Sequence, residues 1–153
     1  MSSAVPLDDI LSGESAIVML AARSADEVLA ELALALARET GLSAIAIEAG
    51  LREREALGST GLGHGLALPH AKAAEISGSR GVLGIAPEGI SFAALDDRPV
   101  RVFVALISST QPNEHLRALA TVGRSFVDPR VIDRVVAAAG QPASVLAILR
   151  GEA

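Results

Sequence analysis

The sequence predicts a three-layer α/β sandwich, in which one β-sheet is covered by helices on both faces. Short apolar runs that are typical of buried strands alternate along the chain with capped, amphipathic helical segments. Half of the residues are hydrophobic but only 2% are aromatic, so the core is expected to be aliphatic. The length suits a single domain over residues 1–153, large enough to bury a core without disulfides or a structural metal.

The first third of the chain contains an expected strand and an expected helix. Ala16–Leu20 is a short apolar run that fits a buried strand. Ser24 and Glu27 have the spacing of a capping box, which opens a helix that Gly41 ends. Apolar residues at helical spacing form the inward stripe of this helix, namely Val28, Leu29, Leu32 and Leu36.

A glycine-rich stretch follows a second expected helix, which runs from a Ser43 cap to Leu57. The stretch, residues 58–65, reads G-S-T-G-L-G-H-G. A phosphate-binding P-loop would need a lysine here, and a dinucleotide fingerprint would follow a strand and precede a helix, the reverse of this order. Nucleotide binding is therefore rejected. Two interpretations stay open: a turn that lets the chain double back, or a nest of backbone amides that holds an anion beside His70.

The second half of the chain is expected to supply two longer strands and three helices. Val82–Ile85 and Val100–Ile107 are apolar runs, the second nearly continuous, as in a sheet covered on both faces. Turn signals at residues 87–89 and 96–99 separate them. The three helices are expected to begin at capping or proline positions, namely Asn113, Asp128-Pro129 and Pro142.

Composition excludes several classes of protein. The net charge is −5 and the sequence pI is about 5.1, which argues against binding to nucleic acid. The absence of cysteine excludes disulfides, thiolate zinc sites and cysteine nucleophiles. The longest apolar stretch, Ala16–Ala22, is far shorter than the ~20 residues of a spanning helix, and the first residues do not resemble a signal peptide. No membrane insertion and a cytoplasmic location are expected.

Three histidines, His64, His70 and His115, are the side chains that titrate near neutral pH. His70 follows Pro69 at the end of a short strand, a position where loops often carry function. His115 lies in the first turn of the helix that Asn113 opens. Free backbone amides there favour an anion and disfavour an imidazolium, so a neutral His115 could donate a hydrogen bond to a phosphoryl oxygen.

Basic residues near His70 suit a phosphoryl group. Lys72 is the single lysine of the chain and lies two positions after His70, while Arg52 and Arg54 lie late on the helix before the glycine-rich stretch. Positive charge and N–H dipoles stabilise phosphoryl oxygens. Arg54 is expected to be a solvated surface charge. A zinc site made by the three histidines is a weaker alternative, because their spacing is unusual and no carboxylate is placed to help.

The segment that ends at His70 resembles the signature of a known family. Residues 52–70 read R-E-R-E-A-L-G-S-T-G-L-G-H-G-L-A-L-P-H, which is similar to fructose/mannitol-type (type 2) enzyme IIA domains of the bacterial phosphoenolpyruvate-dependent sugar phosphotransferase system. The similarity continues through residues 89–100 and 113–116 and covers about Leu7–Leu149. A freestanding domain most resembles the nitrogen-related, regulatory enzyme IIA. The resemblance implies a mixed β-sheet between layers of helices.

The same resemblance implies a phosphotransferase component that carries a phosphoryl group as phosphohistidine. His70 matches the histidine that accepts the group from the histidine phosphocarrier protein, and His115 matches the second, supporting histidine. Arg52 matches the arginine that approaches the site. No cofactor and no metal are implied, because the donor is already a phosphohistidine. An enzyme IIB component or a regulatory target is the implied downstream partner.

The remaining implied site residues lie in the loop before His70 and directly after it. Ser59 and Thr60 match the loop that lines the site, and with Lys72 they are expected to stabilise the phosphoryl group. His64 stands where the family often has Asn or Glu, which makes it a possible neighbour of the site. An alternative function is a non-catalytic regulatory module whose partner contacts depend on its phosphorylation state.

Overall fold

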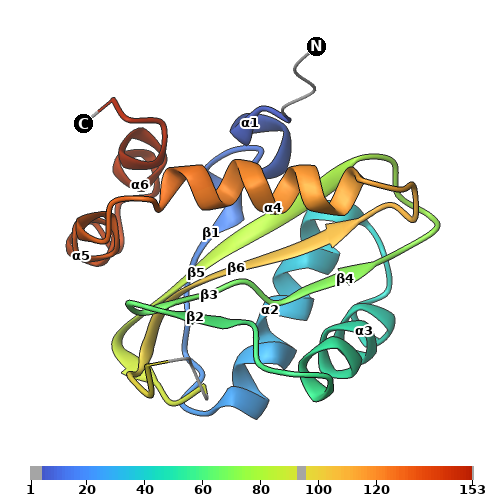
Figure 1. Ribbon diagram of the computed structural model, residues 1–153, viewed down its shortest axis with the longest axis horizontal. Coiled ribbons are helices and arrows are strands. Elements are labelled where there is room, and N and C mark those ends of the chain that lie inside the picture. The colour runs from blue at the N-terminus through green and yellow to red at the C-terminus, as the bar shows by residue number, and fades with distance from the viewer. Residues whose placement is uncertain (1–4, 93–95, 153) are drawn as a thin grey trace.

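The computed structural model describes residues 5–92 and 96–152, and a mixed β-sheet runs through its centre (Figure 1). In this part of the chain the sheet has six strands: β1 (Ile17–Met19), β2 (Gly61–Gly63), β3 (Leu66–Ala67), β4 (His70–Lys72), β5 (Ser79–Ile90) and β6 (Val100–Ser108). Their order is β1-β5-β6-β3-β2, and β4 also pairs with β6. β5 and β6 are antiparallel, whereas β1 is parallel to β5, and β3 and β4 are parallel to β6. The mixed sheet is confirmed.

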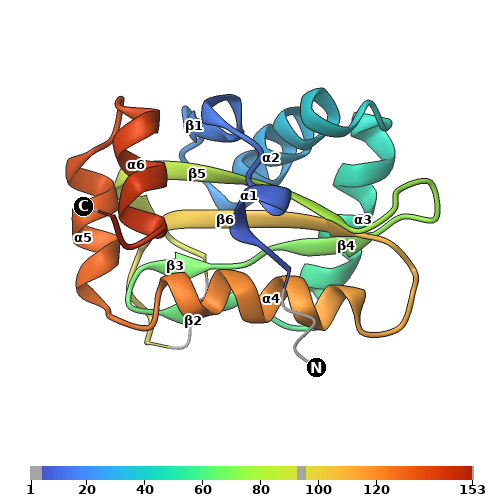
Figure 2. The ribbon, with the colours of Figure 1, turned by 90° about the horizontal axis from the view of Figure 1, so that it is seen from above.

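Helices cover both faces of this sheet, as expected for a three-layer sandwich. The helices of the described residues are α1 (Leu7–Ile10), a 3-10 turn (Glu14–Ala16), α2 (Ala25–Thr40), α3 (Ala44–Ala56), α4 (Glu114–Ser125), α5 (Arg130–Ala137) and α6 (Pro142–Leu149). Figure 2 shows α2 and α3 on one side of the sheet and α4 on the other, with α5 and α6 at one end. Within the described ranges, no helix is both long and apolar enough to cross a membrane.

Two helix caps form as the sequence predicts. The Ser24 hydroxyl accepts the backbone N–H of Glu27 at 3.1 Å, and the Glu27 carboxylate turns back to accept the N–H of Arg23 at 2.8 Å. Ser43 caps α3 in the same way through the N–H of Ala46. These bonds satisfy donors that a helix start leaves without partners. Short-range chemistry therefore fixes where α2 and α3 begin.

The turn expected at residues 87–89 is wrong, because these residues belong to β5. β5 extends on both sides of the predicted strand and keeps its pairing with β6 as far as Ile90. The register shifts between Ile85 and Ile90, where Gly89 has a φ of +81°. Glycine and proline here mark a bulge that bends a long strand rather than a turn that ends it.

The start of α5 agrees with the predicted Asp-Pro start, whereas the start of α4 differs from the predicted cap. The Asp128 carboxylate accepts the backbone N–H of Arg130 at 2.9 Å, the bond that an N-cap residue makes, and Pro129 has helical backbone angles directly before Arg130, where α5 is assigned to begin. Asn113 precedes α4 as expected, but its φ is +71° and its side chain makes no capping bond. Asparagine tolerates this left-handed conformation better than most residues. It thus starts α4 through the backbone turn that it permits.

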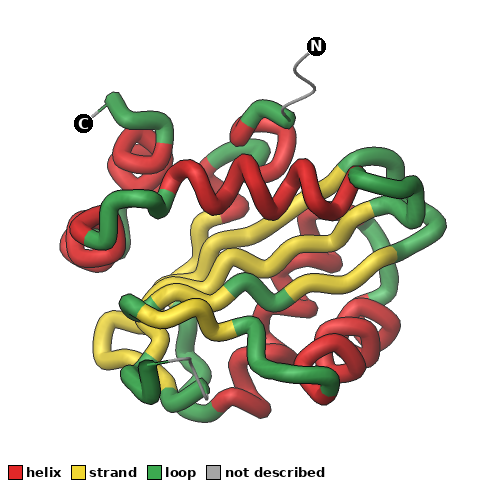
Figure 3. The backbone as a smooth tube through the Cα atoms, in the orientation of Figure 1, coloured by secondary structure: helices red, strands yellow, loops and turns green. Residues whose placement is uncertain are grey.

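The core lies on both faces of β6, which is buried from residue 102 to its end. Phe103 packs edge to face against Phe92, with ring centroids 5.1 Å apart, and aliphatic side chains supply almost all the rest. Figure 3 shows that the loops from β4 to β5 and from β6 to α4 gather at one end of the sheet, opposite the turn between β2 and β3. The fold therefore brings the start of α4 beside β4.

Candidate functional site

The structure brings His70 and His115 together from different elements. His70 is the first residue of β4 and pairs in register with Leu106 of β6, while His115 is the second residue of α4. Their ring centroids are 4.4 Å apart and the rings are tilted by 46°. Forty-five residues separate the two histidines in the sequence, and the turn from β6 into α4 closes that distance.

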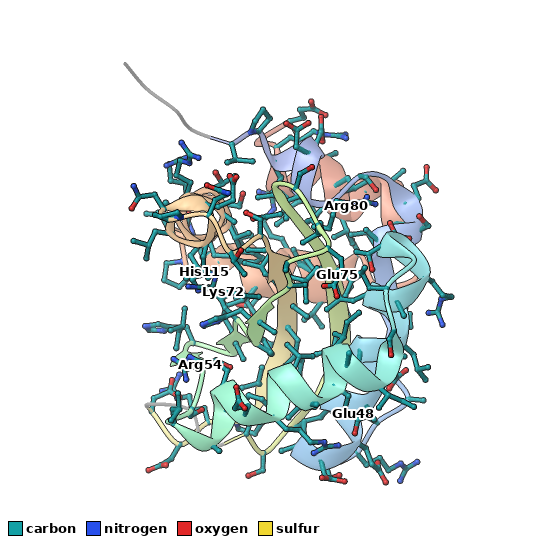
Figure 4. All side chains as sticks on the ribbon, turned by 90° about the vertical axis from the view of Figure 1, so that its right-hand side faces the viewer. Glu48, Arg54, Lys72, Glu75, Arg80 and His115 are labelled. Carbon is teal, nitrogen blue, oxygen red and sulfur yellow. The ribbon has the colours of Figure 1, made fainter. Side chains whose placement is uncertain are left out.

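Alternation along β4 decides which side chains face α4. Ala71 points to the opposite face, where α3 approaches so closely that a Cβ added to Gly50 would lie 3.0 Å from the Ala71 Cβ. His70 and Lys72 therefore share the α4 side of the strand. Figure 4 shows Arg54, Lys72 and His115 on the same side of the molecule, contributed by α3, β4 and α4. Two histidines and two basic side chains thus converge on one point.

Hydrogen bonds fix the tautomer of His70. Its Nδ1 lies 2.7 Å from the carbonyl oxygen of Leu68, and a carbonyl can only accept, so Nδ1 carries the proton. Its Nε2 lies 3.1 Å from Nε of Arg54, and a guanidinium can only donate, so Nε2 presents a lone pair. The two bonds agree with one neutral tautomer. Nε2 is therefore the nucleophilic nitrogen of this ring.

Burial and positive charge keep both rings neutral. Burial is the largest cause that lowers the pKa of His70, and Arg54 and Lys72 lower it further, against the bond to Leu68 and the charge of Glu55, which raise it. Burial, followed by His70, Lys72 and Arg54, lowers the pKa of His115 to about 4. The neutral His115 expected from the sequence follows from desolvation and basic neighbours.

Arg54, not Arg52, is the arginine that reaches His70. Besides its bond to His70, Arg54 donates from Nη1 to the carbonyl of Gly58 at 2.8 Å. Arg52 instead binds the Asp26 carboxylate at 2.6 Å and Glu48 one turn earlier on α3. Residues two apart on a helix point about 200° from each other, so only one of the two can face β4. The expectations for both arginines are corrected.

The hydroxyl groups of Ser59 and Thr60 are engaged within their own loop. Ser59 donates to the carbonyl of Phe92 at 3.0 Å and accepts the N–H of Gly61. Thr60 is buried and donates its hydroxyl and its backbone N–H to the Glu55 carboxylate, at 2.7 and 2.8 Å. Neither hydroxyl proton is free for a phosphoryl oxygen in this conformation. Both hydroxyls hold the loop here, and their direct role at the phosphoryl group stays a prediction.

His64 lies at the other end of the sheet. It occupies the two-residue turn between β2 and β3, with φ of +57°, followed by Gly65 at +87°. β3 starts beside Val102, four residues of β6 before the partner of His70, a separation of roughly 13 Å. His64 is thus not a site neighbour, and the three histidines do not converge on a zinc ion. Elsewhere in residues 5–92 and 96–152, no group of three His, Cys, Asp or Glu is placed to hold a metal.

The glycine-rich stretch is the turn that the sequence allowed, and not an anion nest. β2 and β3 form an antiparallel hairpin around His64 and Gly65. The backbone N–H groups of Thr60, Gly61 and His64 already donate to side chains of the protein, those of Glu55, Ser59 and Asp96. These three backbone amides therefore have hydrogen-bond partners within the protein. They are thus not available to an anion beside His70.

Comparison with known proteins decides the family. Residues 9–151 match the family model described as "Phosphoenolpyruvate-dependent sugar phosphotransferase system, EIIA 2". The chain belongs to this family. As a type-2 enzyme IIA it is a phosphoryl carrier, a phosphotransferase component of a sugar phosphotransferase system or of a nitrogen-regulatory phosphorelay.

Curated relatives and solved structures of enzyme IIA proteins agree with this assignment. A nitrogen regulatory protein of Bradyrhizobium diazoefficiens is 32% identical over 94% of this chain and 96% of its own length. A fructose-specific EIIA component of Haloferax volcanii is 34% identical over 58% of each chain. The crystal structure of the nitrogen regulatory protein IIA-Ntr of Neisseria meningitidis superposes with a TM-score of 0.84 at 31% identity, covering 94% of this chain and 98% of its own. At 23% identity, the mannitol enzyme IIA of Escherichia coli in complex with phosphorylated enzyme IIB covers 91% of this chain and 96% of its own, and its TM-score of 0.76 shows the shared fold.

Glu55 is the part of this enzyme IIA site that the sequence did not reveal. It follows Arg54 directly, and nothing in its spacing from His70 indicates that its carboxylate reaches Thr60. Arg54 could have been preferred to Arg52 only by knowing the rotation of α3 about its axis. Arg52 and Arg54 point in different directions, although both are positively charged residues of α3.

Proposed function

We propose that Nε2 of His70 accepts the phosphoryl group that this enzyme IIA carries. The observation that carries the proposal is the pair of hydrogen bonds on the ring: Leu68 holds the proton on Nδ1, and Arg54 contacts the lone pair on Nε2. A nucleophile that is already deprotonated needs no general base. Positioning and charge stabilisation then supply the catalysis, as in other phosphoryl transfers.

The transfer balances without a cofactor. Nε2 of His70 forms a bond to phosphorus while the phosphorus–nitrogen bond of the donor phosphohistidine breaks, and that electron pair stays on the donor imidazole. Arg54 leaves Nε2 and binds the phosphoryl oxygens, and Lys72 faces them from the same side of β4. His115, 4.4 Å away between ring centroids, donates a hydrogen bond from its neutral ring. The Leu68 carbonyl stabilises the positive charge that the phosphorylated ring develops.

The proposed donor is the histidine phosphocarrier protein, and the proposed acceptor is an enzyme IIB component or a regulatory target. Support for a IIB partner comes from the fructose-specific relative and from the mannitol IIA–IIB complex, which shares this fold. Such a relay draws on phosphoenolpyruvate, a cytoplasmic metabolite, so the proposal places the protein in the cytoplasm. Residues 1–153 act as one enzyme IIA domain in this scheme.

Phosphorylation in a reconstituted relay tests the proposal. Phosphoenolpyruvate, enzyme I and the histidine phosphocarrier protein should add about 80 Da to the wild-type chain in an acid-labile form. The His70→Gln variant should gain no mass, whereas His64→Gln, a matched histidine at the far end of the sheet, should be labelled like the wild type. Labelling of His70→Gln, with circular dichroism showing both variants folded, would refute the assignment.

A regulatory binding module is the second candidate, favoured by the names of the relatives. Five curated relatives and one solved structure are nitrogen regulatory proteins. Phosphorylation would then add up to two negative charges at His70 and change which partner docks. Discharge separates the candidates: a carrier passes its phosphoryl group to an added IIB domain, whereas a regulatory module keeps it while its affinity for a target protein changes.

A further inference from the structure

Glu55 joins the end of α3 to the loop before His70. Its carboxylate accepts two hydrogen bonds from one residue: the Thr60 hydroxyl at 2.7 Å to Oε1 and the Thr60 backbone N–H at 2.8 Å to Oε2. Thr60 is buried, with only 4% of its surface exposed, so these bonds are shielded from competing water. A charged acceptor with two short bonds is a strong anchor for a short loop.

The loop that Glu55 anchors also holds Arg54. The Arg54 guanidinium donates to the Gly58 carbonyl at 2.8 Å, and Gly58 in turn donates its N–H to the backbone carbonyl of Glu55 at 3.1 Å. Only Ser59 separates Gly58 from Thr60. A release of Thr60 therefore moves the carbonyl that orients Arg54 toward His70.

Charge gives Glu55 a second connection with His70. The charged and titratable groups that act on His70 come from three elements: Arg54 and Glu55 from α3, Lys72 from β4, and His115 from α4. Glu55 is the acidic member of this group, and its charge raises the pKa of His70 while Arg54 and Lys72 lower it. Its carboxylate thus opposes the basic groups at the ring that receives the phosphoryl group.

We propose that Glu55 is a positioning residue of the phosphoryl-transfer site, which orients Arg54 through the Thr60 loop and balances the positive charge around His70. The proposal rests on the proposed function of His70. It makes two separable claims, because the hydrogen bonds act on the geometry of Arg54 and the charge acts on the protonation of His70. Different substitutions at residue 55 can remove one without the other.

Glu55→Gln removes the charge and keeps the loop. The glutamine carbonyl can accept the Thr60 N–H, and its amide can donate to the Thr60 hydroxyl. Since Glu55 raises the pKa of His70, its neutralisation lowers that pKa. His70 then stays unprotonated to lower pH. The imidazole titration of His70, followed by NMR in the unphosphorylated protein, and the acid limb of the phosphorylation rate should both shift to lower pH.

Glu55→Ala removes the charge and both hydrogen bonds. Arg54 loses its fixed orientation, and the second-order rate constant for phosphorylation by the histidine phosphocarrier protein should fall about 10- to 100-fold, the size expected when a positioning contact is lost. Thr60→Val keeps the charge and the backbone bond, so it should lower the rate less and leave the titration of His70 in place. A merely structural role for Glu55 would not move that titration.

Glu48→Gln is the matched control on the same helix. Glu48 pairs with Arg52 and lies farther along α3 from Arg54 (Figure 4). Its neutralisation should change neither the titration of His70 nor the rate. An unchanged titration in Glu55→Gln, or wild-type phosphorylation in Glu55→Ala, would overturn the proposal. If Glu55→Ala fails to fold, Glu55→Gln still decides the charge claim by NMR. Absence of phosphorylation in the wild type would refute the proposed function separately, because the titration needs no phosphoryl donor.

Discussion

His64 and His70 lie six residues apart in one segment, and the fold gives them opposite surroundings. His70 is half-buried, with one ring nitrogen bonded to a backbone carbonyl and the other to a guanidinium. His64 is exposed at the tip of the β2–β3 hairpin, where its backbone N–H binds Asp96. The difference teaches that the partners of the ring nitrogens decide whether a histidine can act as a nucleophile.

Backbone geometry produces this contrast. A two-residue turn with positive φ at His64 and Gly65 reverses the chain, and β3 and β4 then carry it along β6 away from the turn. His70 arrives beside the start of α4, while His64 stays at the opposite end. Under the proposed function, this segment therefore has one reactive end, at His70, and one structural end, at His64.

The largest effect, on the rate of phosphorylation, should come from removing Arg54, the arginine that contacts His70. Arg54→Ala removes the donor at Nε2 of His70 and should lower the rate of phosphorylation about 100- to 1,000-fold, as the loss of one preorganised hydrogen-bond donor does elsewhere. Arg52→Ala, two residues earlier on α3, breaks surface ion pairs with Asp26 and Glu48, each worth about 0–1 kcal/mol, and should leave the rate unchanged. Rapid-quench labelling of both variants checks this. Equal decreases of the rate in both variants would mean that Arg54 acts only through its positive charge and not through its contact with His70.

The second effect is the pH dependence of the free energy of unfolding, to which His70 and His115 should contribute more than His64. The pKa of His115 is about 4 in the folded protein, below the ordinary histidine value near 6.5, and that of His70 is also lowered. As the pH falls below about 6.5, the unfolded chain binds these protons first, so the free energy of unfolding decreases. Each group contributes at most about 1.4 kcal/mol per pH unit.

Urea unfolding at pH 7, 6 and 5 measures this dependence. His115→Gln removes one of the two groups, so its free energy of unfolding should fall less steeply across this range than that of the wild type. Parallel curves for the two proteins would show that His115 titrates alike in the folded and unfolded chains. The comparison stops at pH 5 because most carboxylates titrate below it.

The smallest effect should come from improving the structural end. Both central residues of the β2–β3 turn have positive φ, the geometry of a type I′ turn, for which Asn-Gly is the preferred pair. His64→Asn should therefore stabilise the protein by about 0.5–1 kcal/mol, because asparagine adopts the left-handed conformation at lower cost. Thermal unfolding measures the gain, and phosphorylation of His70 should be unaffected. A loss of stability would show that the imidazole makes packing contacts that asparagine cannot replace.

Local chemistry predicted much of the fold. The Ser24 and Ser43 caps and the nearly continuous apolar run of β6 were found from the sequence, because each depends on residues a few positions apart. The turn expected at residues 87–89 was wrong, since the pairing of β5 with β6 overrides the local preference of proline and glycine. Long-range pairing is invisible to a rule that considers only neighbours.

The sequence by itself determined that this chain builds an aliphatic α/β sandwich and that it carries the enzyme IIA signature ending at His70. Tertiary structure alone decided which side chains surround that histidine. Arg54 replaces Arg52 because α3 turns about 100° per residue, and Thr60 binds Glu55 instead of facing the site. The physical reason is direction: sequence fixes the type and spacing of side chains, whereas their orientation toward a common point depends on how helices pack on the sheet.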